Sequence, residues 1–368
     1  MPNRIAKLEK YLDNKLPAAI DEAGLFAGSA GESPSRYSRS PGMWNAAFHE
    51  IGLDAAYCAF DVRPENLKGF IATVRELPGF MGGNVTVPHK LAIMELLDVV
   101  DPVARQIGAV NTYALHEDGG LAGYNTDADG LINSMLRTLP RKSRPFLEAL
   151  TGVRSLLLGA GGAGRAAAFA LAGNIGGAQL TLTNRSLARA QELADEVSQT
   201  YPNVAAVSHA EAVALLPSVD LVVNASTVGQ SGLRHLGGGV TTCLEPFSSL
   251  APANPEVLPE PPDEAAFYRQ WFDASLPAIE ANQAAAARAL MACAPGTAFV
   301  DAVYSPDETV LLRQARLHGH PTLNGKGMLI MQAAESFVNR MTRRHLIAAG
   351  HDPDTLYDRV VETMEAAF

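Results

Sequence analysis

The feature that most constrains this chain is a glycine cluster that directly follows an apolar run, residues 155–158, and precedes an alanine-rich stretch, residues 165–172. The cluster consists of Gly159, Ala160, Gly161, Gly162, Ala163 and Gly164. Glycines with this G-x-G-x-x-G spacing between a strand and a helix permit a tight turn, close approach to a pyrophosphate and close packing of helix on strand. The cluster therefore predicts a dinucleotide-binding fold. The alternative is a glycine-rich turn in an unrelated helix–strand pair.

The residues after the next apolar run, 180–183, indicate which dinucleotide such a fold would bind. An NAD-specific domain usually has Asp or Glu here, whose carboxylate accepts from the ribose 2′-hydroxyl and repels a 2′-phosphate. This chain instead has Asn184, Arg185, Ser186 and Arg189. Two guanidinium groups one helical turn apart can hold a phosphate dianion, so they favour NADP as the cofactor. The alternative is that both arginines belong to an ordinary solvated helix start.

Short apolar runs alternate with stretches of helical periodicity along most of the chain. The first set of runs lies at 25–27, 56–60 and 84–87, with helices expected after Pro41, at 65–77 and from Lys90. A second set lies at 155–158, 180–183 and 220–224. This alternation predicts α/β structure with largely parallel sheets. A length of 368 residues, 47% of them hydrophobic, favours two domains over one.

Three further segments have patterns of their own. Residues 5–16 carry apolar side chains at helical spacing and predict an amphipathic opening helix. Residues 251–262 contain five prolines and so cannot form a regular helix or a central strand: Pro252, Pro255, Pro259, Pro261 and Pro262. A helix-rich segment is expected after them, over residues 264–292.

The formal net charge of −10 argues against nucleic acid or an anionic membrane as a partner, because clustered Lys and Arg hold both. The three cysteines, Cys58, Cys243 and Cys293, are far apart and suggest neither a disulfide framework nor a metal site. The N-terminal residues of the chain include several charged side chains, and no apolar run approaches the roughly 18 residues that a membrane span requires. The expected location is the cytoplasm.

Polar clusters follow the apolar runs of the N-terminal half, where α/β sheets place their ligands. They are Ser-Arg-Ser-Pro at 38–41, Asn-Val-Thr-Val-Pro-His-Lys at 84–90, Gly-Ala-Val-Asn-Thr at 108–112 and Gly-Tyr-Asn-Thr-Asp at 123–127. The C-terminal half adds Asn-Ala-Ser at 224–226, Asp-Ala-Val-Tyr at 301–304 and Gly-Lys-Gly-Met-Leu at 325–329, with Gln332. In this order the motifs resemble the shikimate dehydrogenase family over most of residues 24–340.

The resemblance implies roles for individual residues. Ser38 and Ser40, helped by Tyr304, would bind a substrate carboxylate. The ring hydroxyls would be hydrogen-bonded by Asn84, Thr86, Asn111 and Gln332, and Lys90 and Asp127 would be the catalytic pair. Cofactor-binding residues would be the glycine cluster, the four residues after the second strand, and Asn224, Ser226 and Gly325. No metal is implied.

The chemistry of the pair can also be argued from the residues. Hydride transfer to a carbonyl carbon leaves negative charge on the oxygen, so a positioned acid must donate a proton. Lys90 is the obvious donor, Asp127 can orient it, and two such groups in contact titrate as a coupled pair. The alternatives are an exposed lysine at a helix start and an aspartate that serves as a helix N-cap. The family pattern does not use His89.

Three departures from the family pattern are visible. The loop at 28–37 is longer than usual, and Tyr37 and Trp44 stand where histidines are common. About 70 residues separate residues 224–226 from the next core strand at 299–301, which implies an insertion at about 230–297 with its own burial partner. That insertion could form a lid, an oligomer contact or a cover for the back of the domain. Gln230-Ser231 also replaces the residues that often follow the glycine near the nicotinamide in this family.

The resemblance implies two α/β domains: a substrate-binding domain with a mixed, largely parallel sheet, residues 1–127 plus 328–368, and a Rossmann NADP-binding domain, residues 128–327. Helices at 327–340 and 356–367 would return the chain to the first domain. The implied activity is reduction of 3-dehydroshikimate to shikimate with NADPH, towards chorismate and the aromatic amino acids, by a monomer or homodimer. The alternatives are a quinate/shikimate or aminoshikimate dehydrogenase and a non-catalytic sensor of the same acid.

Overall fold

The computed structural model describes residues 3–236, 238–260 and 263–368, which form two compact units. The first unit includes the chain up to Ser134 together with Thr138–Arg144 and Leu329–Phe368. The second consists of Met135–Arg137 and Pro145–Met328. The first crossing between units thus follows Ser134, within the helix that begins at Thr126, whereas the predicted boundary follows residue 127.

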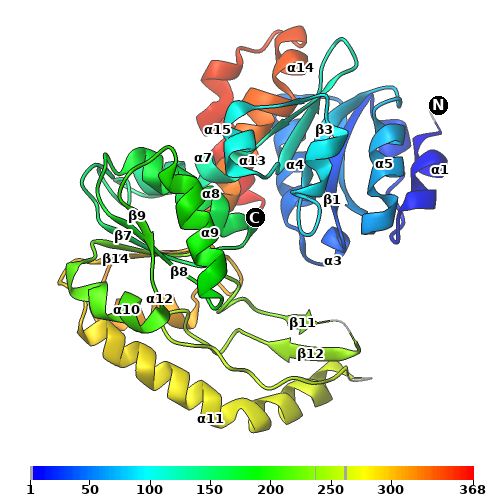
Figure 1. Cartoon of the computed structure of the whole chain (residues 1–368). Helices are drawn as coiled ribbons and strands as arrows, with labels where there is room; N and C mark the ends of the chain where they lie inside the picture. The colour runs from blue at the N-terminus through cyan, green and yellow to red at the C-terminus, as the bar shows by residue number, and fades with distance from the viewer. Residues whose placement is uncertain (1–2, 237, 261–262) are drawn as a thin grey trace. The chain divides into compact units, whose positions relative to one another are not determined.

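A six-stranded sheet of order β2-β1-β3-β5-β6-β4 forms the centre of the first unit (Figure 1). Its strands are β1 (Leu25–Gly31), β2 (Ala55–Asp61), β3 (Phe80–Val85), β4 (Val99–Val100), β5 (Thr112–Leu115) and β6 (Leu121–Tyr124). Neighbours pair in parallel except β5, which is antiparallel to β3 and to β6. The predicted mixed, largely parallel sheet is confirmed.

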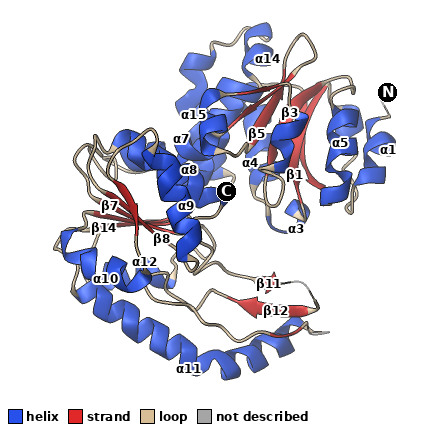
Figure 2. Cartoon of the chain, viewed as in Figure 1, coloured by secondary structure: helices blue, strands red, loops and turns tan. Residues whose placement is uncertain are grey.

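Helices cover both faces of this sheet (Figure 2). Side chains alternate along a strand, so Phe26 and Ala30 of β1 pack into one apolar core while Ala27 packs into the other. The first core includes residues of α1 (Arg4–Leu8) and α5 (Leu67–Val74), and the second those of α4 (Ser40–Ile51) and α15 (Pro353–Ala366). The shorter helices are α2 (Ala19–Glu22), α3 (Pro34–Tyr37), α6 (Pro102–Ile107), α14 (Arg343–Ala348), η1 (Glu9–Tyr11) and η2 (Pro64–Asn66).

Three predicted helices differ from those observed. The opening helix ends early because Leu12 is extended and bridges to Val62. No helix begins at Lys90, where Pro88 lacks an N–H and the Lys90 carbonyl accepts from the Val110 N–H at 2.9 Å; only the 3₁₀ turn η3 (Ala92–Leu96) follows. The returning helix at 327–340 is α13 (Lys326–Glu335) continued by a π-helical turn, η5 (Ser336–Met341).

The second unit is built on a six-stranded parallel sheet of order β15-β14-β10-β7-β8-β9. Its strands are β7 (Ser155–Leu158), β8 (Leu180–Thr183), β9 (Val204–Ala206), β10 (Leu221–Asn224), β14 (Ala298–Asp301) and β15 (Thr322–Leu323). α8 (Gly162–Asn174) and α9 (Leu187–Ser198) lie on one face, and α10 (His209–Leu215) and α12 (Val310–Leu317) on the other (Figure 1). Four of the strands are buried along their whole length, as expected for a sheet covered on both sides.

The insertion has a hydrophobic core of its own. Three antiparallel strands, β11 (Leu233–His235), β12 (Val240–Cys243) and β13 (Leu258–Pro259), pack with the helix α11 (Glu264–Met291). Phe267 and Trp271 of α11 are buried against Cys243 and Phe247. The proline-rich stretch contributes only the two-residue edge strand β13, and Pro261 and Pro262 lie outside the described residues. The aromatic helix therefore finds its burial partner within the insertion.

Among the described residues, no helix combines the length and the apolar character needed to cross a membrane.

Candidate active site

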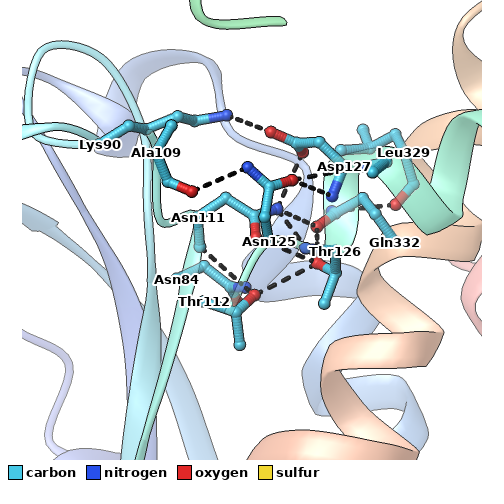
Figure 3. A network of polar contacts seen from close by, with 11 residues as sticks. Asn84, Lys90, Ala109, Asn111, Thr112, Asn125, Thr126, Asp127, Leu329 and Gln332 are labelled. Carbon is cyan, nitrogen blue, oxygen red and sulfur yellow. Dashed lines mark hydrogen bonds and ion pairs between the residues drawn. The ribbon is translucent and has the colours of Figure 1, made fainter. Parts of the chain in front are cut away.

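The ammonium of Lys90 and the carboxylate of Asp127 form an ion pair in the first unit, with 2.5 Å between Nζ and Oδ2 (Figure 3). Lys90 lies in the turn after β3, and Asp127 lies in the first turn of α7 (Thr126–Leu136). Their side chains are 18% and 12% exposed. The alternative interpretation of Lys90 as an exposed surface lysine is therefore wrong. Both side chains are therefore largely, but not completely, shielded from solvent.

The N-cap of α7 is Asn125 rather than Asp127, so the alternative interpretation of Asp127 as the cap is also wrong. The Asn125 Oδ1 accepts from the backbone N–H groups of Asp127 and Ala128 at 3.1 and 3.3 Å, and its amide donates to the Ala109 carbonyl at 3.0 Å. Because Asn125 satisfies these helix-start donors, the Asp127 carboxylate is left for side-chain partners.

Asn111 connects the Asp127 carboxylate to the returning helix α13. Its Nδ2 lies 2.8 Å from Asp127 Oδ1 and 3.3 Å from Gln332 Oε1, and its Oδ1 accepts from the Thr126 N–H at 2.7 Å. Gln332 in turn donates to the Leu329 carbonyl at 3.1 Å. Figure 3 shows these amides gathered around Asp127. The arrangement offers several neutral donors and acceptors beside one ion pair.

Asn84, at the end of β3, belongs to an adjoining network. Its Nδ2 donates to Thr112 Oγ1 at 2.9 Å and to Ser336 Oγ at 3.1 Å, while its Oδ1 accepts from the Tyr57 hydroxyl at 2.7 Å. Sequence patterns do not predict this role for Tyr57, Thr112 or Ser336. Only Thr112 carried a signal, as the last residue of a polar motif.

The structure places Ser38 and Ser40 on either side of the start of α4, and the Ser40 N–H donates to Ser38 Oγ at 3.2 Å. Thr86 follows β3 and is half-buried. His89 is 1% exposed with Nε2 2.7 Å from the Val62 carbonyl oxygen, so it packs away from solvent. Tyr304 belongs to the second unit, on the loop after β14.

The glycine turn of the second unit fits a dinucleotide. Gly159 has φ +112°, and a Cβ on Gly164 would lie 2.3 Å from the Gly159 carbonyl oxygen, so the turn requires glycine at both positions. A Cβ on Gly161 or Gly162 would meet nothing within 4 Å, which leaves open space at the start of α8. That combination of a tight turn and a free helix start is what a pyrophosphate needs.

The loop after β8 adjoins this turn. Asn184 Oδ1 accepts from the Ala160 N–H at 3.4 Å, and Ser186 is the N-cap of α9, its hydroxyl oxygen accepting from the Arg189 N–H. Arg185 and Arg189 are exposed, and the described residues supply no carboxylate paired with either side chain. Two unneutralised guanidiniums at a helix start suit a phosphate dianion.

Asn224 and Gly325 shape the neighbouring loops. The buried Asn224 amide donates to the Val228 carbonyl at 3.2 Å and to Asp301 Oδ1 at 2.8 Å, and its oxygen accepts from the Ser226 N–H and hydroxyl. All of its hydrogen-bonding capacity is thereby used within the protein. A Cβ on Gly325 would lie 2.1 Å from the Ala302 carbonyl oxygen, so only glycine fits there.

Asp301 should make stability depend on pH. Burial raises the pKa of its carboxyl to about 7, against the lowering effect of hydrogen bonds donated by Thr309, Val303 and Asn224. The pKa of this carboxyl is higher in the folded protein than in the unfolded chain, so its protonated form stabilises the fold. That contribution to the free energy of unfolding is complete below about pH 4 and is lost as the pH rises to about 7. In thermal unfolding, Asp301→Asn should therefore show a flatter decline in Tm than the parent protein between about pH 4 and pH 7. Parallel Tm profiles for the two proteins would contradict the assignment.

A parallel sheet with a glycine turn at the start of a helix, and a separate unit that holds a lysine–aspartate pair among amides, define a two-domain α/β dehydrogenase. Two family models match: the shikimate dehydrogenase substrate binding domain over residues 32–113, and shikimate / quinate 5-dehydrogenase over residues 142–234. The chain belongs to the shikimate dehydrogenase family.

Curated relatives and solved structures agree with this assignment. The chain is 38% identical to the shikimate dehydrogenase (NADP(+)) of Symbiobacterium thermophilum and 35% identical to that of Shouchella clausii, over 82% of this chain and 84% and 88% of those proteins. It is 29% identical to the Thermus thermophilus shikimate 5-dehydrogenase solved with NADP(H) and shikimate. The TM-score is 0.62, and the match covers 94% of this chain and 100% of that one. For the Corynebacterium glutamicum quinate dehydrogenase solved with NAD, the identity is 27% and the TM-score 0.67, with coverage of 93% and 99%.

Proposed function

We propose that this chain catalyses the reversible, NADP-dependent reduction of 3-dehydroshikimate to shikimate, a step towards chorismate and the aromatic amino acids. The observation that carries the proposal is the Lys90–Asp127 ion pair set among neutral amides. Membership of the family and the names of the relatives support it. As a soluble acidic dehydrogenase of this kind it would act in the cytoplasm, as a monomer or homodimer.

Lys90 is the residue that moves the proton in this proposal. NADPH, held by the glycine turn at residues 159–164, would supply the hydride for the ketone carbon. As negative charge develops on the ketone oxygen, the Lys90 ammonium stabilises it and donates a proton, and in the reverse direction the neutral amine accepts the hydroxyl proton. Asp127 holds the amine in place and can accept from the substrate hydroxyl. Asn111, through its bond to Asp127 Oδ1, fixes the carboxylate orientation.

The remaining polar residues account for the choice of substrate. Ser38 and Ser40, with Tyr304, would donate to the ring carboxylate, and Asn84, Thr86, Asn111 and Gln332 would bind ring hydroxyls. Each amide offers both a donor and an acceptor, which matches a hydroxyl. The Asn224 amide already uses all of its hydrogen bonds within the protein. It would therefore affect cofactor binding indirectly, by holding the Ser226 loop in shape.

Steady-state rates on shikimate and on quinate, each with NADP⁺ and NAD⁺, test the proposal. Shikimate with NADP⁺ should give the highest kcat/KM, because Arg185 and Arg189 suit the 2′-phosphate. The family resemblance also implies that the small Ser40, in place of a bulkier threonine, suits a planar shikimate-like ring. Faster turnover of quinate with NAD⁺ would overturn both the substrate and the cofactor, and would favour the activity named for the Corynebacterium relative. Binding of shikimate without turnover of either acid would favour a ligand sensor.

A further inference from the structure

Arg234 is a half-buried cation in the insertion that the proposed reaction does not use. It lies in the middle of β11, where its neighbour across the ladder is the uncharged Thr242. The adjacent His235 has an acidic partner, Glu260, at 3.1 Å. Within the described part of the chain, Arg234 has no carboxylate of its own. Arginine is rarely buried without a partner, so this position calls for an anion.

The base of the β11–β12 hairpin is fixed at the carboxyl edge of the parallel sheet. The Ser231 N–H donates to the Ser305 carbonyl at 2.9 Å, and the two serine hydroxyls lie 2.7 Å apart. Ser231 follows β10 and Ser305 follows β14, so both belong to loops at the edge where such sheets bind ligands. Arg234 is three residues beyond this anchor, a span of at most about 11 Å.

The loop that carries Arg185 leaves the same edge of the sheet. It follows β8, which is two strands from β10 in the order β10-β7-β8, a separation of about 10 Å. The hairpin and the loop that carries Arg185 therefore leave the same edge of the sheet, about two strand spacings apart.

The positive charge of Arg185 acts on Arg234. Burial lowers the pKa of Arg234, and the positive charge of Arg185 lowers it further. Two like charges held together in a partly desolvated place oppose each other, and a bound anion would relieve that repulsion. The anion that the proposed cofactor brings to Arg185 is a phosphate.

We propose that Arg234 is a third guanidinium for the adenosine 2′-phosphate of NADP, supplied by the insertion, and that it contributes to the choice of NADP over NAD. The proposal rests on the proposed function, because it takes NADP to be the cofactor. It gives the insertion a part in cofactor recognition in addition to its own packing.

The test compares Arg234→Gln and Arg234→Lys with the parent protein by calorimetric titration with adenosine 2′,5′-bisphosphate and with 5′-AMP. Arg234→Gln should weaken binding of the bisphosphate by about 10-fold or more, since a hydrogen-bonded charge pair is lost, and leave 5′-AMP within about twofold. Arg234→Lys should recover part of the loss. Arg269→Gln, which removes an exposed cation from α11 of the same insertion, should bind both ligands as the parent does.

Equal weakening of both ligands would place Arg234 elsewhere on the nucleotide and overturn the proposal, as would unchanged binding of the bisphosphate. Thermal unfolding checks the fold of each variant; the Tm of Arg234→Gln should equal or exceed that of the parent, because a repelled cation is removed. If the parent protein itself binds the bisphosphate no more tightly than 5′-AMP, then the assignment of NADP as the cofactor is wrong, and the proposed role of Arg234 falls with it.

Discussion

Replacement of Lys90 by alanine should lower kcat for shikimate oxidation by about 10² to 10⁴-fold, the usual contribution of a positioned acid–base group. The KM for shikimate should change little, because the ring is held mainly by the serines and amides that the variant retains. The physical reason is that no other ammonium faces Asp127 in the described residues, so the developing alkoxide would have no protein proton donor. Steady-state kinetics with NADP⁺ at several pH values measure the effect.

Lys68→Ala is the matched control, since Lys68 is an exposed lysine on α5 of the same unit. Its kinetics should equal those of the parent protein. Asp127→Asn adds a second comparison: it keeps the shape of the side chain but removes the charge that holds the Lys90 amine. Undiminished turnover by Lys90→Ala would remove this lysine from the mechanism.

The double variant Arg185→Gln/Arg189→Gln should reverse or abolish the preference for NADP. Hydrogen bonds to a charged group contribute roughly 1.5–3 kcal/mol each, so losing both guanidiniums should weaken NADPH binding by about 10² to 10⁴-fold. NADH has no 2′-phosphate and serves as the internal control, and its dissociation constant should hold or improve. Fluorescence titration of both reduced cofactors provides the measurement.

Equal loss of affinity for NADPH and NADH would contradict this specificity role. It would indicate that the two arginines bind a group common to both cofactors or stabilise the start of α9, where the Arg189 N–H already donates to Ser186. Thermal unfolding of the double variant separates these two explanations.

The sequence predicted best those features whose cause is local. The apolar run at 180–183 is β8, and the glycine cluster lies between β7 and α8 as its spacing requires. The sequence did not identify the N-cap of α7, because Asn and Asp are both favoured at that position. The hydrogen bond from the Asp127 N–H to Asn125 Oδ1 shows that Asn125 is the cap. The expected helix from Lys90 failed for a tertiary reason, the bond from the Val110 N–H to the Lys90 carbonyl.

Contacts between distant residues could not be derived from local pattern. Lys90 and Asp127 were proposed as a pair through the family resemblance, since 37 positions separate them. Ser336 contacts Asn84 across 252 positions and lies in a π-helical turn that no sequence pattern marked. Tyr57 sits within the apolar strand β2, where it reads as an ordinary core residue. The electrostatic effect of Arg185 on Arg234 depends on the fold of the insertion, which no local pattern in the sequence predicts.

The first unit is interrupted in the chain, and this affects the order in which the protein can assemble. Its apolar core needs Phe337, Val360 and Met364, and its polar network needs Gln332. A ribosome therefore releases the whole of the second unit before it releases the last segment that the first unit requires. The first unit is thus the first to be synthesised but the last to be completed. Until residues 329–368 are released, one face of its sheet stays uncovered, and chaperones would have to shield that face.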